Sequence, residues 1–444
     1  MKEEPRVSLV HLGCARNLID SELILGRMAE AGLMIAGDTS DADYVVLNTC
    51  SFIGPAREES ENAINELLER KASGELRGVV VAGCLVQRYQ RVLEKRFPGV
   101  DLFAEISDYR ELARSVKELS EGRAIPAYLE AGGLRSAGRD GARLLSTPQS
   151  YSYLRISHGC DHQCSFCAIP SIRGPHRSKS LASVLDEGRE LIDAGVRELV
   201  LVAEDSTAWG RDENRELPEL VEGLADLGGA RVRLMYAYPN RFPWGLTELL
   251  RDHENVVPYL DMPVQHISTA VLRAMRRAGS GDQVRKIVDR LHEEVPGVTM
   301  RTTLLVGFPG ETEEDVDELV EFVTSYGLGR VGVFTYSDEE GTSAFGLEGA
   351  VPPEVAQERA DRVHAARDEV LEASQAALVG TVQEVIVDEV LDLEYGTIGR
   401  TDRDAPEVDM ICAATGGGDI EPGARVQVRV DGLDEEFNLV GSVV

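Results

Sequence analysis

Short β-branched segments alternate with helix-length segments along the first 120 residues of this 444-residue chain. Three of the short segments, at residues 7–12, 44–47 and 79–82, are candidate strands, and a helix-length stretch follows each of them. Strands and helices that alternate in this way are typical of βαβ units, whose strands lie parallel in one sheet. The pattern therefore predicts an α/β chain that begins with a parallel βαβ domain.

A second alternating series begins at residue 151. Six βα repeats in succession favour a partial (β/α)6 barrel, in which chemistry is expected at the carboxyl ends of the strands. Thr312 and Asp315 mark the start of one intervening helix as a capping-box variant. The six candidate strands cover residues 153–157, 198–203, 233–237, 258–261, 300–306 and 331–336.

The remaining segments are separated by changes of composition. Residues 121–150 are rich in Gly, Ala, Arg, Ser and Pro, and we expect a linker there. Pro352 and Pro353 precede a long polar helix, after which short alternating runs with Gly-rich turns such as 416–418 suggest a small antiparallel barrel. The predicted parts are a βαβ domain at 5–120, a linker at 121–150, a partial-barrel core at 151–376 and a β-barrel at 377–444.

Charge and hydropathy limit the partners of the chain. There are 77 acidic and 46 basic residues, which gives a net charge of −31, and residues 381–444 alone have four Arg, no Lys and fifteen Asp or Glu. Because nucleic-acid affinity depends largely on Lys and Arg at phosphates, this charge argues against direct nucleic-acid binding and favours a basic partner. No apolar run reaches the ~20 residues that cross a bilayer and no secretory signal is visible, so we expect a cytoplasmic protein without a membrane partner.

Three of the seven cysteines lie at equivalent places in the first series. Cys14, Cys50 and Cys84 each fall within three residues of the end of a candidate strand. Because the carboxyl ends of parallel strands share one edge of a sheet, these three thiols can meet at one point. The alternative is that each is an ordinary small core residue. The isolated Cys412 is expected to be a plain thiol, and the odd cysteine count argues against disulfides.

The other three cysteines, Cys160, Cys164 and Cys167, are spaced C-x3-C-x2-C directly after the first strand of the second series. Three thiolates can hold three irons of a 4Fe-4S cluster and leave the fourth iron without a protein ligand. An open metal position is what a catalytic centre requires. The alternative is a zinc site, with His158 or His162 as the fourth ligand.

With Phe166 before its last cysteine, this motif resembles that of the radical S-adenosylmethionine (SAM) superfamily, and the partial barrel agrees with that likeness. A three-cysteine βα domain before the core and a small barrel after it resemble the methylthiotransferases, whose last domain is called TRAM. The resemblance covers nearly the whole chain. It implies that the C-x3-C-x2-C cysteines hold a 4Fe-4S cluster that binds SAM, and that Cys14, Cys50 and Cys84 hold a second, auxiliary 4Fe-4S cluster.

Within this family, several segments look like the RimO branch, which modifies ribosomal protein S-twelve, rather than the MiaB branch, which modifies tRNA adenosine. The most diagnostic are IPSIRG at 169–174 and DAPEVD at 404–409. The others are GCARNLIDSE at 13–22, NTCSFI at 48–53, GCLVQRY at 83–89 and VFTYSDEEGT at 333–342. Ala15, Glu204 and Met410 depart from the usual pattern of the family.

The resemblance implies methylthiolation of the β-carbon of an aspartate of the basic ribosomal protein S-twelve. SAM would be both the methyl donor and the radical source, and an electron donor and a sulfur source would also be needed. Two alternatives remain at this point: the same chemistry on tRNA, and a non-catalytic iron–sulfur carrier. A carrier, however, would normally close its clusters with four ligands.

Polar residues near the strand ends of the core are candidates for SAM binding, although no catalytic side chain can be named from the sequence. Glu204 and Asp205 follow the second strand, and Gln265 and His266 follow the fourth. Each has a structural alternative: a solvated turn for the two acids and a buried structural role for the histidine. Arg301 and Arg173 can meet a carboxylate of SAM or substrate, or lie at the surface. The predicted cofactor-binding residues are Glu204, Asp205, Gln265 and Arg301.

Overall fold

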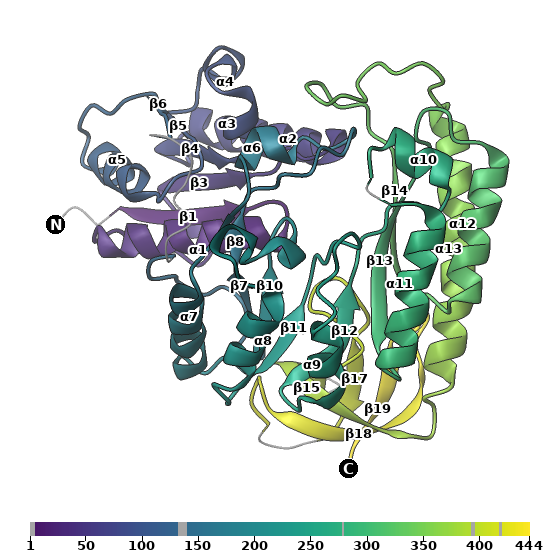
Figure 1. Cartoon of the computed structure of the whole chain (residues 1–444). Coiled ribbons are helices and arrows are strands. Elements are labelled where there is room, and N and C mark those ends of the chain that lie inside the picture. The colour runs from purple at the N-terminus through teal and green to yellow at the C-terminus, as the bar shows by residue number, and fades with distance from the viewer. Residues whose placement is uncertain (1–4, 132–139, 278, 392–395, 417–419) are drawn as a thin grey trace. The chain divides into compact units, whose positions relative to one another are not determined.

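The computed structural model describes residues 5–131, 140–277, 279–391, 396–416 and 420–444 (Figure 1). The chain forms two compact units. The first comprises Met1–Ser146, His158–His162 and Cys167–Arg177, and the second comprises Thr147–Ser157, Gln163–Phe166 and Ser178–Val444. The predicted α/β fold class is confirmed in each of its three parts. None of the described helices combines the length and the apolar character needed to span a membrane.

The first unit is built on a six-stranded, wholly parallel sheet in the order β2-β1-β3-β4-β5-β6. Every residue of β3 and β4 is buried, as expected for the central strands of a parallel sheet covered on both faces. β6 lies inside the segment expected to be a linker, of which residues 132–139 lie outside the described residues. The strands are β1 (Arg6–His11), β2 (Met34–Ile35), β3 (Tyr44–Thr49), β4 (Gly78–Gly83), β5 (Leu102–Ala104) and β6 (Tyr128–Leu129).

Helices connect these strands and cover the sheet. The hydrophobic core between them contains Val45, Leu47, Val79 and Val81 from β3 and β4, with Ile64 from α2. The helices of this unit are α1 (Ala15–Glu30), α2 (Gly54–Ala72), α3 (Cys84–Tyr89), α4 (Val92–Arg96), α5 (Arg110–Ser120) and, from the later segment, α6 (Ile169–Arg173), with a 3-10 turn η1 (Thr39–Asp41).

The second unit contains a second parallel sheet of six strands, in the order β14-β13-β12-β11-β10-β7. The sheet is open between β7 and β14, which is the expected partial barrel. Its strands are β7 (Ser152–Arg155), β10 (Glu198–Val202), β11 (Arg231–Leu234), β12 (Val256–Asp261), β13 (Thr299–Val306) and β14 (Arg330–Thr335). Two further strands, β8 (Ser157–His158) and β9 (Arg177–Ser178), form a separate two-stranded sheet.

The helices of the core alternate with its strands, and two of them begin with complete capping boxes. Ser280 and Gln283 cap α11, and Thr312 and Asp315 cap α12, as the sequence predicts for the second pair. The helices are α7 (Leu181–Asp193), α8 (Leu217–Ala225), α9 (Leu246–Asp252), α10 (Thr269–Ala274), α11 (Gly281–Glu294), α12 (Glu313–Ser325) and α13 (Pro353–Ala376), with 3-10 turns η2 (Ser206–Ala208) and η3 (Arg211–Glu213).

The carboxyl-terminal residues form a closed five-stranded barrel in the order β15-β16-β17-β19-β18. All of its pairings are antiparallel except the one between β17 and β19, which is parallel. Cys412 lies in its core, where burial raises the pKa of the thiol to about 12. The expected turn at 416–418 falls mostly outside the described residues. The strands are β15 (Val382–Val390), β16 (Thr397–Arg400), β17 (Cys412–Thr415), β18 (Arg425–Leu433) and β19 (Leu439–Val443).

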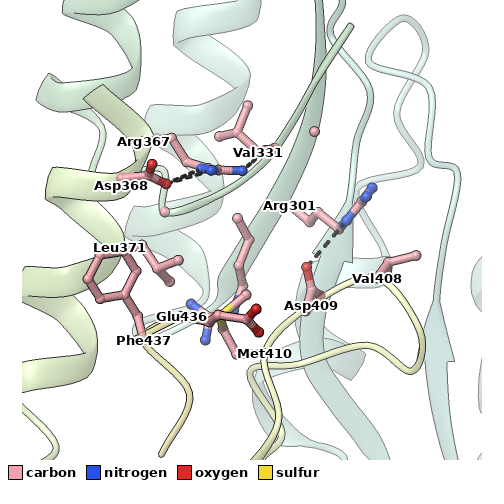
Figure 2. Close-up of a pocket in the computed structure, with 13 residues that line it drawn as sticks. Arg301, Val331, Arg367, Asp368, Leu371, Val408, Asp409, Met410, Glu436 and Phe437 are labelled. Carbon is pink, nitrogen blue, oxygen red and sulfur yellow. Dashed lines mark hydrogen bonds and ion pairs between the residues drawn. The ribbon is translucent and has the colours of Figure 1, made fainter. Parts of the chain in front are cut away.

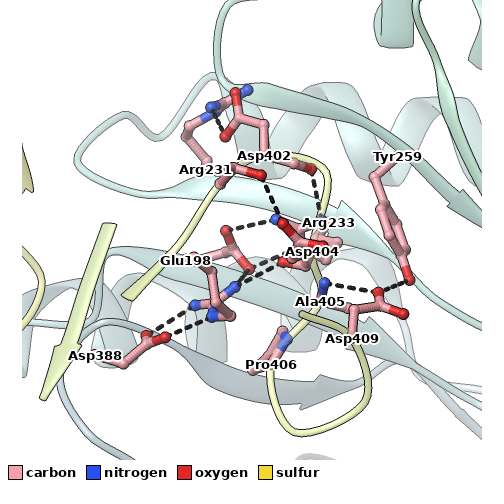
Figure 3. Close-up of polar contacts among 12 residues, drawn as sticks. Glu198, Arg231, Arg233, Tyr259, Asp388, Asp402, Asp404, Ala405, Pro406 and Asp409 are labelled. Carbon is pink, nitrogen blue, oxygen red and sulfur yellow. Dashed lines mark hydrogen bonds and ion pairs between the residues drawn. The ribbon is translucent and has the colours of Figure 1, made fainter. Parts of the chain in front are cut away.

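The loop between β16 and β17 lies against the strands of the core at the end where these strands begin (Figure 3). Asp402 pairs with Arg231 at the start of β11, and Asp404 accepts from Arg330 Nη2 at the start of β14, 2.7 Å away. Glu407 accepts a hydrogen bond from the Tyr153 hydroxyl of β7 at 2.8 Å. Residues 401–409, which we call the plug segment, therefore bind several core strands at once.

Candidate functional site

The structure brings Cys14, Cys50 and Cys84 to the same edge of the first sheet. Cys14 is the N-cap of α1 after β1, Cys50 follows β3, and Cys84 is the first residue of α3 after β4. β1, β3 and β4 are neighbours in the sheet and run parallel, so their carboxyl ends lie side by side. Cys84 is buried and the other two thiols are partly buried. The three thiols thus lie at the carboxyl ends of neighbouring parallel strands, as the sequence predicts.

Two glycines let the backbone loops at this edge approach closely. A Cβ atom at Gly13 (φ +113°) would lie 3.0 Å from Cys50 Cβ and 3.3 Å from Cys50 Sγ. Gly83 has φ +96°, and a Cβ atom there would collide with the Asn48 side chain. A side chain at either position would be strained and would push the loops apart. The two glycines therefore let the cysteine-bearing loops approach one another.

The three thiols are close enough to affect one another's protonation. Burial raises the pKa of Cys84 to about 11; Arg173 opposes this rise, whereas Cys50 and Cys14 add to it. Burial also raises the pKa of Cys50. Burial acts in the same direction on Cys14, but Arg16 and Arg173 outweigh it and lower the pKa of that thiol. The guanidinium groups thus favour the thiolate form that metal ligation requires.

Buried polar side chains hold the loops around the thiols. The Asn17 amide donates to Leu12 O at 2.6 Å and to Thr49 O at 3.2 Å, so that it ties the ends of β1 and β3 together. Arg173 Nη1 donates to Asp20 Oδ2 at 2.6 Å, and Arg173 Nη2 donates to Cys84 Sγ at 3.3 Å. Arg173 was expected to meet a carboxylate or lie at the surface; in the structure it is buried and its carboxylate partner is Asp20.

Both units contribute to the C-x3-C-x2-C motif: Cys160 and Cys167 belong to the first and Cys164 to the second. In the first unit, the Cys160 amide donates to Gly174 O at 3.0 Å. In the second unit, Arg277 Nη1 donates to Cys164 Sγ at 3.5 Å. All three cysteines are partly buried. Cys160 and Cys164 are therefore each restrained by a hydrogen bond within their own unit.

The donor set at Cys14, Cys50 and Cys84 fits an iron–sulfur cluster with one open corner. Among the residues that the structure describes, no three His, Cys, Asp or Glu side chains are grouped closely enough to hold a single metal ion. A 4Fe-4S cube carries its irons at separate corners, so its ligands are more widely spaced than those of one ion. Three converging thiols without a fourth cysteine match three of those corners. A single-ion zinc site completed by His158 or His162 is not found in the described part of the chain.

Three of the predicted cofactor-binding residues lie beyond the carboxyl ends of core strands. Glu204 follows β10, is partly buried, and has a buried Oε2 with no hydrogen-bond partner among the described residues. Asp205 is buried and accepts from Thr207 Oγ1 at 2.6 Å. Gln265 has φ +73° and forms an isolated bridge to Leu304 of β13. The neighbouring His266 accepts backbone bonds from Ile267 and Ser268 through Nδ1, which is a structural role.

Arg301 lies elsewhere, near the start of β13. Its Nη1 is 3.0 Å from Asp261 Oδ1, and its Nε is 3.4 Å from Asp409 Oδ1 of the plug segment. A cavity of about 370 Å³ adjoins it, between α13 and the C-terminal barrel, with Arg367, Met410 and Phe437 in its wall (Figure 2). SAM binding by Arg301, like that by the other three residues, stays a prediction.

Sequence reasoning missed the roles of Asn17, Asp20 and Arg277. The signal available was on α1, where Asn17, Asp20 and Ser21 lie on one helical face in an otherwise apolar pattern. Polar side chains at i, i+3 and i+4 on a buried face indicate a polar site rather than a plain core. For Arg277 we find no comparable local signal.

Three family models match the chain. They are the radical SAM superfamily over residues 154–323, the uncharacterized protein family UPF0004 over residues 6–105, and the TRAM domain over residues 379–444. A protein of Bacteroides thetaiotaomicron named ribosomal protein uS12 methylthiotransferase RimO is 40% identical over 446 residues, which cover 99% of this chain and 98% of that protein. A protein of the same name from Geobacter sulfurreducens is 40% identical over 445 residues, with the same coverage.

Among solved structures, the chain is similar to the radical SAM methyltransferase TsrM from Kitasatospora setae, solved with cobalamin and a 4Fe-4S cluster bound. The TM-score is 0.54 and the sequence identity 17%, and the match covers 77% of each chain. A second structure of TsrM, with tryptophan and a SAM analogue, gives a TM-score of 0.53. At this identity the likeness concerns the fold alone.

Proposed function

The chain belongs to the family of ribosomal protein uS12 methylthiotransferases named RimO, and we propose that it replaces a hydrogen on the β-carbon of an aspartate of this ribosomal protein by a methylthio group. The enzyme is a radical SAM methylthiotransferase. The observation that best supports the proposed reaction is the convergence of Cys14, Cys50 and Cys84 at one sheet edge, in a chain that also has the C-x3-C-x2-C motif.

Two 4Fe-4S clusters would be held by the two cysteine triads. When bound together with SAM, they supply a carbon radical and a transferable sulfur, which an unactivated C–H bond requires because no side-chain base removes such a hydrogen at neutral pH. SAM would serve as both methyl donor and radical source, and an electron donor and a sulfur source are needed as partners. The chain itself supplies the thiolates and the groups that orient SAM.

Glu204, Asp205 and Gln265 would orient SAM at the carboxyl ends of the core strands. The buried Glu204 Oε2 has no hydrogen-bond partner among the described residues, and such an oxygen is costly unless a donor reaches it. An amine or a hydroxyl group of SAM can donate that bond. Asp205 accepts a hydrogen bond from Thr207 Oγ1 at 2.6 Å, which holds its carboxylate in place beside Glu204.

The experiment uses the full chain, reconstituted with iron and sulfide without oxygen. The wild type is expected to hold about eight irons, and Cys14→Ala/Cys50→Ala/Cys84→Ala about four. Incubated with SAM and a reductant, this triple variant still cleaves SAM but no longer methylthiolates the ribosomal protein. Cys412→Ala is the matched control, because it removes a buried thiol from the C-terminal barrel and leaves both triads intact.

Mass spectrometry of both candidate substrates decides between the functions. A gain of SCH3 minus H on the aspartate of the ribosomal protein supports the proposal. The same gain on tRNA would assign the chemistry to the other substrate, and SAM that stays uncleaved would leave only an iron–sulfur carrier. About four irons in the wild type would contradict the second cluster.

A further inference from the structure

Arg173, the last residue of α6, lies between two cysteine-bearing loops of the first unit. Its side chain donates to Cys84 Sγ at 3.3 Å and to Asp20 at 2.6 Å, and both Arg173 and Asp20 are almost fully buried. The next residue, Gly174, accepts the hydrogen bond of the Cys160 amide at 3.0 Å. One short turn thus contacts a thiol of the auxiliary site and the backbone of the first cysteine of the C-x3-C-x2-C motif.

We propose that Arg173 is a positioning residue for the auxiliary cluster: its guanidinium binds the sulfur of Cys84 and raises the reduction potential of the cluster. The inference rests on the proposed function, because it requires a cluster at Cys14, Cys50 and Cys84. Hydrogen bonds to ligand sulfurs and nearby charge are known determinants of the potential of iron–sulfur clusters. A buried cation stabilises the reduced form, which carries one more negative charge.

The geometry favours this role over a simple ion pair. A guanidinium presents several donors in a planar fork, so one arm can bind Asp20 while the other binds sulfur. Both contacts are buried. Charges interact more strongly there than in water, because they are weakly screened. Asp20 binds the other terminal nitrogen of the guanidinium and carries the opposite charge, so we expect it to shift the potential in the opposite direction.

The test measures the midpoint potential of the auxiliary cluster by redox titration with electron paramagnetic resonance. It is done in full-length protein that carries Cys160→Ala/Cys164→Ala/Cys167→Ala, so that only this cluster is observed. Arg173→Met should lower the potential by about 59 mV, which is a tenfold change in the ratio of reduced to oxidised cluster for one electron. Arg173→Lys should retain part of the effect, and Asp20→Asn should raise the potential.

Arg143→Met is the matched control, because Arg143 forms a buried ion pair with Glu22 on the same helix as Asp20. It should lower stability and leave the potential unchanged. Shifts of opposite sign in Arg173→Met and Asp20→Asn cannot arise from general loosening of the fold. Normal iron content with an unmoved potential in both variants overturns this inference alone. Absence of any auxiliary cluster in the parent protein overturns the inference and the proposed function together.

Discussion

At the scale of single residues, the core of the second unit depends on arginines that share buried carboxylates. Glu198 of β10 accepts from Arg233 Nε at 2.9 Å and from Arg400 Nη1 at 3.1 Å, and Arg400 also donates to Asp388 at 2.7 Å (Figure 3). Burial alone would raise the pKa of Glu198, but Arg233 and Arg400 outweigh it and lower the pKa to about 2. A buried carboxylate beside two cations is therefore ionised at neutral pH.

This arrangement predicts a pH dependence of stability. The pKa of Glu198 is lower in the folded state, so its contribution is fully present above its ordinary pKa of 4.5 and is lost as the pH falls toward about 2. Glu198→Gln should therefore be clearly less stable than wild type at neutral pH, and the difference should narrow from about pH 5 downward. Urea denaturation at a series of pH values measures it.

Glu248→Gln, on the exposed side of α9, controls for the loss of one negative charge. A stability difference between wild type and Glu198→Gln that stays constant from neutral to acidic pH would show that the carboxylate is not held by its two arginines.

Arg301 gives a second prediction at this scale. Asp261 and Asp409 are both buried and both face its guanidinium, so Arg301→Met leaves two buried acids without their cation. We expect a loss of about 3–5 kcal/mol of unfolding free energy. Arg367→Met should cost less than about 1 kcal/mol, because Arg367 is partly exposed and pairs with its neighbour Asp368.

Urea denaturation and SAM titration of the same variants separate the two possible roles of Arg301. A structural role lowers the unfolding free energy and leaves the SAM affinity of the folded protein unchanged. A normal unfolding curve combined with lost SAM binding would instead support the cofactor role that the sequence suggested.

At the scale of elements, the plug segment explains why the DAPEVD run is so polar and yet partly buried. Asp404 and Asp409 are buried against arginines that begin or nearly begin core strands, and Tyr259 donates to Asp409 at 2.6 Å. The segment therefore acts as a clamp between the C-terminal barrel and the core. Its two buried acids, Asp404 and Asp409, bind the protein's own arginines and are therefore not exposed to a substrate.

A matched pair of substitutions in this segment tests the clamp. Asp404→Asn removes the charge that holds buried Arg330 and should cost about 3–5 kcal/mol of unfolding free energy. Asp402→Asn, two residues away, should cost less than about 1 kcal/mol, because the Asp402 side chain is 40% exposed. Thermal unfolding with limited proteolysis of the barrel measures both. Equal losses of unfolding free energy in the two variants would contradict the clamp, because the clamp depends on the buried charge of Asp404.

The sequence predicted those elements whose pattern is long enough to read. β3, β4 and β13 are apolar or alternating runs of six to eight residues, and each was expected within two residues of its observed ends. β2, β5 and β6 have only two or three residues, so they show no periodicity, and β17 (CAAT) has little β propensity. These strands exist because neighbouring strands and the core stabilise them.

The candidate site was predictable only in part, namely where a general rule of parallel sheets applies. The rule that parallel strands share their carboxyl ends brought together three cysteines separated by more than thirty residues each. No such rule connects Arg173 with Asp20, which lies 153 residues earlier, or Arg301 with Asp409. Long-range pairs of this kind depend on how the loops pack and leave no local trace in the sequence.

At the scale of the whole molecule, the net charge of −31 must be divided between acids that bind within the protein and acids that face solvent. In the C-terminal barrel, Asp388, Asp404 and Asp409 bind buried arginines. Exposed acids remain on the turn between β18 and β19, where Asp434, Glu435 and Glu436 follow one another. This turn therefore presents three consecutive exposed acids that can attract a basic protein.

The last prediction concerns the rate at which the basic ribosomal protein associates. Glu435→Gln/Glu436→Gln should lower the association rate about two- to threefold at low salt, because long-range attraction raises encounter rates. The control Glu58→Gln/Glu59→Gln removes the same charge from an exposed pair on α2 and should have a smaller effect.

Near 1 M salt, where charges are screened beyond about 3 Å, all rates should converge. Stopped-flow fluorescence across a salt series measures them. Equal slowing by both double variants would mean that only total charge matters, and a rate independent of salt would contradict electrostatic attraction altogether.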